Sequence, residues 1–306
     1  MNNLKTLILG LSFLLIFQAC KQKPQSAPPI DTWREGSATF AADESFQPIV
    51  DQEEYVFTAL NPKAKPTITY RSENDVLRLL LNDSVRVALL SRDLDSNELR
   101  ILEKRKLTPS VGEFAIDGVV LIVNKVSNDT TITVNEIKKM LNGQAKTDKN
   151  IVFDNEGSSL LRYLKDLSGN NDFKLKNIFA LKSNKELIKY VSTHPNAIGI
   201  TSFCWMDEPD SDYAGAAKDV KIVAVRDENN KKYGTQYFKP SQTSFDLKQY
   251  PLSRSLFIIN CTDKMGLGAG FEMFLLSEKG QRIILESGLL PARIPGREIS
   301  IKKSFN

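Results

Sequence analysis

Runs of apolar residues in this chain predict short strands that are each followed by a polar loop and then by an amphipathic helix. The pattern first occurs at residues 37–50, where alternation gives way to the apolar helix positions Phe46, Ile49 and Val50. It recurs at residues 67–81 and 151–164. Repetition of this unit predicts an α/β fold.

Each of the three loops carries serine near the start of its helix: Ser45, Ser72, and the pair Ser158 and Ser159. Serine is a good N-cap, and capping alone would explain any one of these residues. The start of a helix also presents unpaired backbone N–H groups, which bind anions. Three such loops in one chain favour an anion-binding cradle.

Two longer apolar strands are predicted at residues 114–124 and 250–260, and the first contains a single charge, Asp117. The stretch between them has enough predicted helices and strands for a unit of its own. The chain of 306 residues can bury a large core. We therefore predict lobe I from residues 31–118 and 253–306, lobe II from residues 119–252, and two crossover strands that join them.

A buried strand at residues 85–90 is predicted to deliver Ser91 and Arg92 at its carboxyl end, where open α/β sheets bind ligands. Arginine suits a bidentate contact with an oxyanion. The alternative is an arginine that pairs with Asp93 or Glu98 at the surface, as exposed arginines often do.

The spaced glycines at residues 266–270 are not preceded by a clear strand or followed by Gly-Lys-Ser/Thr, so they do not predict a phosphate loop. We expect a turn there, before a helix that starts near Phe271.

The first 20 residues have the features of a bacterial lipoprotein signal. Lys5 precedes an apolar run at residues 7–17 that is too short to cross a bilayer. The run ends at Gln18-Ala19-Cys20, which resembles a lipobox with Cys20 as the lipidated residue. Residues 21–30 are polar and proline-rich, as in a tether. We expect a folded body from near Asp31, held at a membrane outside the cytoplasm.

Composition excludes some classes of function. With 41 basic and 37 acidic residues, and no basic run interleaved with aromatic residues, the chain is not expected to bind nucleic acid. It has one histidine, His194, and no metal-ligand spacing or nucleophile-elbow pattern, so we expect no metal and no cofactor. No acidic residue lies alone in an apolar setting that would raise its pKa. Cys204 and Cys261 are expected in different lobes as free, buried thiols.

The order of these segments resembles the PstS family, the periplasmic phosphate-binding proteins of phosphate ABC transporters, and in particular its lipoprotein members in Bacteroidetes-type bacteria. The resemblance covers roughly residues 35–300. It is carried by residues 40–48, 70–75, 91–94 with Glu98, 117–124, 157–159, 197–199, 250–252, 278–281 and 288–291.

The resemblance implies a type II periplasmic-binding-protein fold that closes over phosphate or a similar oxyanion. It also implies a monomer without enzymatic activity that delivers its ligand to an ABC permease in the inner membrane. The ligand contacts that it implies are Ser45, Phe46, Ser72, Ser91, Arg92, Ser158 and Ser159.

The chain departs from the family pattern in three respects near its loops. Asp154 stands where the family usually has arginine, and Leu160 replaces a hydroxyl residue. Acidic residues also crowd the loops with negative charge: Asp43, Glu44, Glu73 and Glu156. An acid near the ligand could accept a proton from hydrogen phosphate and so reject fully ionised sulfate. Two alternatives stay open: a sensing or adhesion module with the same fold and an altered site, and a phosphoester hydrolase.

Overall fold

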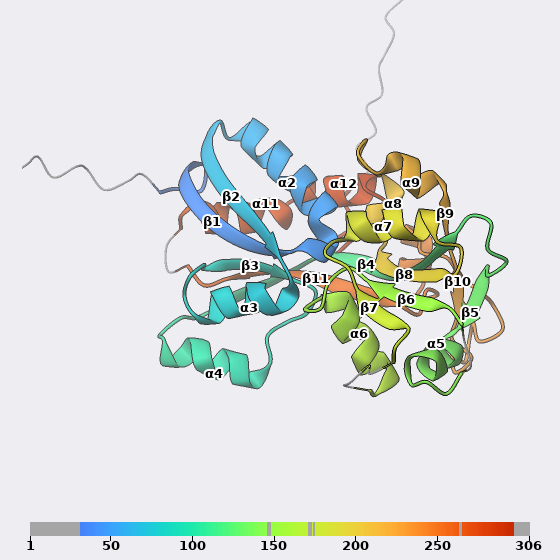
Figure 1. Ribbon diagram of the computed structural model, residues 1–306. Helices are drawn as coiled ribbons and strands as arrows, with labels where there is room; N and C mark the ends of the chain where they lie inside the picture. The colour runs from blue at the N-terminus through green and yellow to red at the C-terminus, as the bar shows by residue number, and fades with distance from the viewer. Residues whose placement is uncertain (1–30, 146–147, 171–172, 174, 263–264, 297–306) are drawn as a thin grey trace, which may run out of the picture. The chain divides into compact units, whose positions relative to one another are not determined.

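The computed structural model describes residues 31–296, except 146–147, 171–172, 174 and 263–264 (Figure 1). The predicted signal sequence, Cys20 and the tether therefore lie outside the described residues. Within the part that is described, no helix is long and apolar enough to cross a membrane.

A mixed sheet runs through the molecule in the order β2-β1-β3-β11-β4-β8-β6-β7, and β9 and β12 both pair with β4 (Figure 1). Two further short strands, β5 and β10, pair with each other. The strands are β1 (Glu35–Asp43), β2 (Lys63–Arg71), β3 (Val87–Leu90), β4 (Ser110–Asn124), β5 (Thr131–Thr133), β6 (Asn150–Phe153), β7 (Ile178–Ala180), β8 (Ala197–Ser202), β9 (Val220–Ile222), β10 (Ala224–Arg226), β11 (Ser253–Asn260) and β12 (Leu290–Pro291).

Helices cover both faces of the sheet: in lobe I, α3 and α4 lie on one face and α2, α11 and α12 on the other (Figure 1). The helices are η1 (Glu44–Phe46), α2 (Gln47–Leu60), α3 (Glu73–Leu81), α4 (Ser96–Lys104), α5 (Val134–Leu141), α6 (Ser159–Ser168), α7 (Asn184–Thr193), α8 (Cys204–Asp207), α9 (Ala214–Lys218), α10 (Gln242–Asp246), α11 (Leu267–Leu275) and α12 (Glu278–Glu286).

Period-two alternation along the strands divides their side chains between two cores. Phe40 and Ala42 of β1 lie in one apolar cluster, whereas Ala41 lies in the other. In β3, Leu89 and Ala88 are divided in the same way. Strands that are buried on both faces need this double covering by helices, which explains their nearly continuous apolar sequence.

The long strand β4 links the two halves of the sheet. It pairs with β11 up to Gly118, opposite Ser253, and with β8 from Val119 onward. Next to this change of partner, the Val119 backbone N–H donates a hydrogen bond to the Leu252 carbonyl, at 2.8 Å. The division into lobes at 118/119 and 252/253 stays a prediction.

Two expected strands begin at other residues than predicted. The strand expected from residue 250 begins at Ser253, because a turn at Pro251 and Leu252 precedes it. The strand expected at residues 67–70 begins at Lys63 and includes Pro66. A strand at the edge of a sheet tolerates proline, and β2 pairs only with β1.

The expected glycine turn at residues 266–270 is wrong, because Gly268 and Gly270 lie inside α11. A Cβ atom at Gly270 would be 2.0 Å from the carbonyl oxygen of Trp33. Glycine therefore allows this helix to approach the chain at Trp33 closely.

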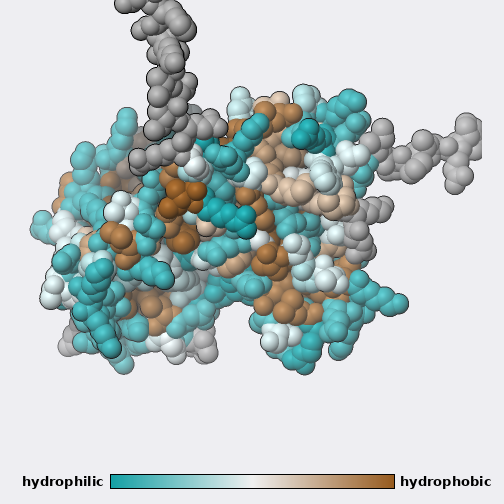
Figure 2. All heavy atoms as spheres, turned by 180° about the vertical axis from the view of Figure 1, so that it is seen from behind, coloured by the Kyte–Doolittle hydropathy of each residue, from teal (hydrophilic) through white to brown (hydrophobic). Residues whose placement is uncertain are grey.

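Seen from behind, the surface carries several small groups of apolar side chains separated by polar ones (Figure 2). Scattered apolar residues of this kind are usual on protein surfaces.

Candidate functional site

The candidate site is centred on the buried guanidinium group of Arg254, which lies on an inward-facing position of β11. Its Nη1 donates to Ser159 Oγ at 2.8 Å and its Nη2 donates to Ser45 Oγ at 3.0 Å. The two serine hydroxyls are 3.0 Å from each other, although 114 positions separate them in the sequence. Three distant segments of the chain therefore meet at one cation.

Asp117 holds the arginine from the neighbouring strand. The two residues are register partners of β4 and β11, and Arg254 Nε donates to Asp117 Oδ2 at 3.0 Å. Ser202 Oγ donates to the same carboxylate oxygen at 2.6 Å. A buried ion pair is stable only when such hydrogen bonds offset its desolvation. The contacts fix the guanidinium plane and leave its outer edge for the two serines.

The serines of the three loops divide into two kinds. Ser72 caps α3 by accepting from the Asp75 backbone N–H, and Ser158 caps α6 by accepting from that of Leu160. Capping therefore explains these two hydroxyls. Ser45 and Ser159 instead contact Arg254, and Asp43 Oδ1 accepts from the Ser45 backbone N–H at 2.9 Å.

Ser91 belongs to a second polar group beside the first. Its hydroxyl donates to Glu73 Oε2 at 2.9 Å and accepts from Arg162 Nη2 of α6 at 3.1 Å. Arg162 also forms an ion pair with Glu73. This group links Ser91, at the end of β3, to α3 through Glu73 and to α6 through Arg162.

Arg92 is engaged mainly with Glu98. Its two Nη atoms donate to both carboxylate oxygens of Glu98, at 2.8 and 2.6 Å. Its Nε is 3.8 Å from Glu73 Oε1. The alternative interpretation of Arg92, an arginine paired with Glu98, therefore describes its present contacts, and its role as a ligand contact stays a prediction.

The ring of Phe46 packs against the guanidinium group of Arg254. This buried ring has its centroid 5.9 Å from Arg254 Cζ, which is within the range of a cation–π contact. The ring also packs edge-on against Phe114 at 6.4 Å between centroids. Apolar packing on this side shields the guanidinium from water.

The segment around Ser45 touches the opposite lobe at several points. Asn184 donates from its backbone N and its Nδ2 to the two carboxylate oxygens of Glu44, at 3.2 and 2.8 Å. Trp205 Nε1 donates to the Ser45 carbonyl at 2.9 Å. A Cβ atom at Gly157 would be 2.7 Å from Ser72 Oγ. Segments of the predicted lobe I and lobe II are thus in direct contact around the candidate site.

Three acids at this contact have raised pKa values. Burial, with the charge of Glu73, raises the pKa of Asp43 to about 6, although Arg254 opposes the shift. Burial raises the pKa of Asp154 to about 7, and burial with the charge of Asp154 raises that of Glu44 to about 8. The expectation that no acid lies in a setting that raises its pKa is wrong, because folding buries these carboxyl groups among residues that are distant in the sequence.

Sequence reasoning missed Arg254 as well as its neighbours Asn184 and Trp205. A signal for Arg254 was present, since it is the one charge in an apolar strand, and Asp117 is the one charge set into the other long strand. Two single charges of opposite sign on facing strands predict a buried pair, provided that the strands are known to be neighbours.

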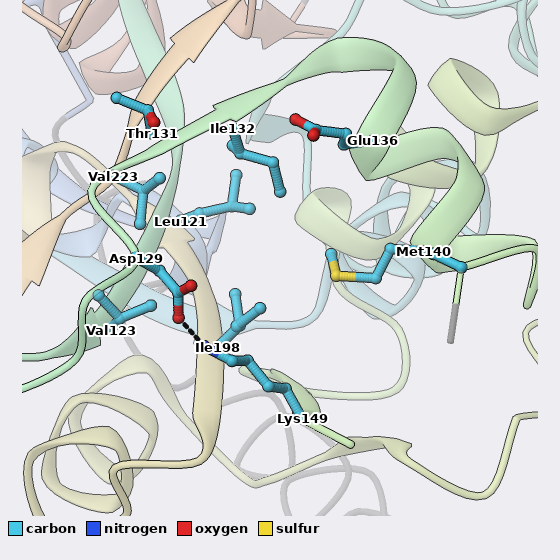
Figure 3. Close-up of a pocket in the computed structure, with 11 residues that line it drawn as sticks. Leu121, Val123, Asp129, Thr131, Ile132, Glu136, Met140, Lys149, Ile198 and Val223 are labelled. Carbon is cyan, nitrogen blue, oxygen red and sulfur yellow. Dashed lines mark ion pairs between the residues drawn. The ribbon is translucent and has the colours of Figure 1, made fainter. Parts of the chain in front are cut away.

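A separate cavity of about 260 Å³ opens in lobe II between β4, β8 and α5. Leu121, Val123 and Ile198 line it on the sheet side, and an ion pair between Asp129 and Lys149 lies at one end (Figure 3). None of the residues that line this cavity belongs to the group around Arg254.

No group of three potential metal ligands occurs among the described residues. Cys204 carries a free, buried thiol 3.0 Å from Ser202 Oγ, as expected from the sequence. Burial raises the pKa of this thiol well above its usual value, so the group is neutral.

Comparison with known proteins identifies the fold. The profile of a PBP superfamily domain matches residues 24–279. The phosphate-binding protein PstS of Borreliella burgdorferi is 26% identical over 307 residues, which cover 95% of this chain and 99% of that protein.

Two solved structures have the same fold. One, from Clostridium perfringens, is described as a phosphate ABC transporter substrate-binding protein with bound phosphate; it has a TM-score of 0.69 and 20% identity, and the match covers 84% of this chain and 100% of that one. An ABC-type phosphate transport receptor from Vibrio cholerae has a TM-score of 0.61 and 19% identity, covering 83% of this chain and 99% of that one. The chain belongs to the PBP superfamily and has the two-lobed, type II periplasmic-binding-protein fold predicted from its sequence.

Proposed function

We propose that this protein captures phosphate or a similar oxyanion outside the cytoplasm for an ABC importer. The observation that carries the proposal is the meeting of Ser45 and Ser159, from opposite lobes, at the buried Arg254. The names of the relatives, which are phosphate-binding transport proteins, support the same ligand.

The arrangement suits an oxyanion because its donors come from both lobes. Two hydroxyls and one guanidinium, together with backbone N–H groups at the starts of α3 and α6, can surround a tetrahedral anion without a metal. On binding, the ligand would replace the hydrogen bonds that Ser45, Ser159 and Arg254 now make with one another. Closure of the lobes would then depend on the ligand.

We assign the charged contact to Arg254 in preference to Arg92. Arg254 already donates to a serine of each lobe, whereas both Nη atoms of Arg92 are committed to Glu98. Phe46, Ser72, Ser91 and Ser158 surround these residues and stay in the proposal as further contacts.

In the cell, the protein would act at a membrane together with a permease. Lipidated Cys20 would hold the body at a membrane, the ligand-bound form would dock on a permease, and the protein would act as a monomeric binding protein and not as an enzyme. The names of the relatives from Clostridium perfringens and Vibrio cholerae, which are ABC transport proteins, support the part of this context that concerns the permease. Labelling of cells with palmitate would test the anchor. We expect the protein to carry the label and to leave the membrane only in detergent, and we expect Cys20→Ser to carry no label.

Thermal unfolding of the ligand-free protein in the presence of phosphate, sulfate, molybdate and a phosphonate tests the ligand. A ligand at 100 times its dissociation constant should add about 2.7 kcal/mol to the free energy of unfolding. We expect a rise in the unfolding temperature with phosphate and no rise with sulfate.

Absence of a shift with every oxyanion would contradict the proposal. It would favour the alternative of a sensing or adhesion module with an altered site, for which the buried Asp154 in place of arginine is the supporting observation.

A further inference from the structure

We propose that this site takes up its oxyanion together with protons, which Asp43, Glu44 and Asp154 hold, so that ligand binding is coupled to proton uptake by the protein. The inference rests on the proposed function and adds to it the protonation state of the site.

Two of the three carboxyl groups have an oxygen atom that is buried without a hydrogen bond. Asp43 Oδ2 and Asp154 Oδ1 have no hydrogen-bond partner among the described residues. An ionised oxygen in this position is costly, because it has lost water and gained no donor. A protonated carboxyl group at the same place becomes a donor that needs an acceptor, and an oxyanion supplies one.

The third carboxyl group is linked to Asp154 across the lobes by a single amide. Asn184 Nδ2 donates to Glu44 Oε2 at 2.8 Å and to Asp154 Oδ2 at 3.2 Å. Thr201 Oγ1 fixes the amide by donating to Asn184 Oδ1 at 2.6 Å. Two buried carboxylates held by one neutral amide repel each other, so the contact between the lobes favours at least one proton on the pair.

The nearby cations are already paired with other acids. Arg254 is paired with Asp117, and Arg162 with Glu73. A further arginine, Arg92, is paired with Glu98.

The buried Cys204 thiol contributes no charge, and within the described part of the chain none of Asp43, Glu44 and Asp154 forms an ion pair of its own. Arg254, which is paired with Asp117, opposes the raised pKa values of Asp43 and Asp154 only in part. A bound anion would add to this negative charge. The three acids must then hold their protons more tightly when the ligand is bound, and ligand binding draws protons from solution.

The direction of the pKa shifts agrees with this reasoning. The pKa values of about 6 for Asp43, 7 for Asp154 and 8 for Glu44 place these groups where they exchange protons near neutral pH. Affinity should therefore rise as the pH falls from 8 to 6, since more of the sites are then already protonated.

Calorimetric titration of the full chain with phosphate tests the inference. Heats measured at pH 6, 7 and 8, each in two buffers of different ionisation enthalpy, give the number of protons bound per phosphate. We expect affinity at least about tenfold higher at pH 6 than at pH 8, and more protons taken up than the titration of phosphate itself requires.

Phosphate also titrates in this range, so the decisive comparison is with Asp154→Asn and Glu44→Gln. These variants keep the shape of the side chain but cannot gain or lose its carboxyl proton. Because phosphate titrates equally in both proteins, its contribution cancels in the difference between wild type and variant. We expect fewer protons per phosphate and a smaller ratio of affinities between pH 6 and pH 8. Asp246→Asn, at an exposed acid of α10, is the matched control and should behave as the wild type.

Equal proton uptake in the wild type and in both variants would overturn the inference while leaving phosphate capture intact. If neither variant folds, wild-type uptake no greater than that of phosphate alone would overturn it. Absence of binding at every pH would instead contradict the proposed function.

Discussion

Ser158 and Ser159 are neighbours in the chain, yet their hydroxyls have different partners. Ser158 Oγ accepts from the Leu160 backbone N–H, so it stabilises the start of α6. Ser159 Oγ accepts from Arg254 and lies next to Ser45 Oγ. The difference between capping and ligand binding can therefore be tested at two adjacent positions.

Ser159→Ala should lower the affinity for phosphate by about ten- to a hundredfold, because a hydrogen bond to a charged group contributes about 1.5–3 kcal/mol. Ser158→Ala should mainly lower the free energy of unfolding, by about 1 kcal/mol. Calorimetry and chemical denaturation of both variants provide the two measurements. The reverse pattern would show that the roles assigned to the two hydroxyls are interchanged.

Glu53 of α2, away from the group around Arg254, also has buried carboxyl oxygens without a hydrogen bond. Burial raises its pKa to about 9 from the ordinary 4.5. The folded protein therefore binds a proton that the unfolded chain releases, and the stability of the fold decreases as the pH rises through this window.

Glu53→Met should raise the free energy of unfolding by about 1–3 kcal/mol at pH 8, since it removes a buried, unsatisfied polar group. The gain should be larger at pH 9 than at pH 5. Urea denaturation at both pH values measures it, with the exposed Glu103→Met as the control. A gain that does not depend on pH would exclude a buried carboxyl group as its cause.

At the scale of elements, most strands and helices follow from the pattern of apolar residues. The unit expected at residues 151–164 occurs as β6 followed by α6, and β4 contains the whole strand expected at residues 114–124. The failure at α11 has a physical reason. Glycines in a helix resemble a turn in the sequence, because the Trp33 carbonyl that requires a glycine at position 270 is more than 200 positions away.

Gly270→Ala should destabilise the fold by at least about 1–3 kcal/mol, because its Cβ would meet the Trp33 carbonyl oxygen at 2.0 Å and the backbone would have to move. Gly215→Ala in α9 is the matched control, since no atom lies within 4 Å of its added Cβ. That change should stabilise the helix by about 0.5–1 kcal/mol. Equal effects of the two changes in thermal denaturation would refute the close approach of α11.

At the scale of the whole molecule, the sequence predicted the α/β fold and the segments that form the site, but not which side chains meet there. Ser45 and Ser159 could be selected because local patterns mark the starts of helices. Arg254 could not, because its importance depends on the pairing of β11 with β4 and on burial between the lobes. The raised pKa values of Asp43 and Asp154 depend on the same burial.

We propose above that the oxyanion binds between the predicted lobes at Arg254. The most direct test is the phosphate affinity of Arg254→Lys and Arg92→Gln, measured by calorimetry on protein whose folding is checked by its unfolding temperature. Lysine keeps the charge but cannot contact Asp117 and both serines in one plane. We predict a loss of at least about a hundredfold for Arg254→Lys and less than about tenfold for Arg92→Gln. Unchanged affinity in Arg254→Lys, together with loss of binding in Arg92→Gln, would contradict this assignment. It would indicate that the oxyanion binds at Arg92, at the end of β3.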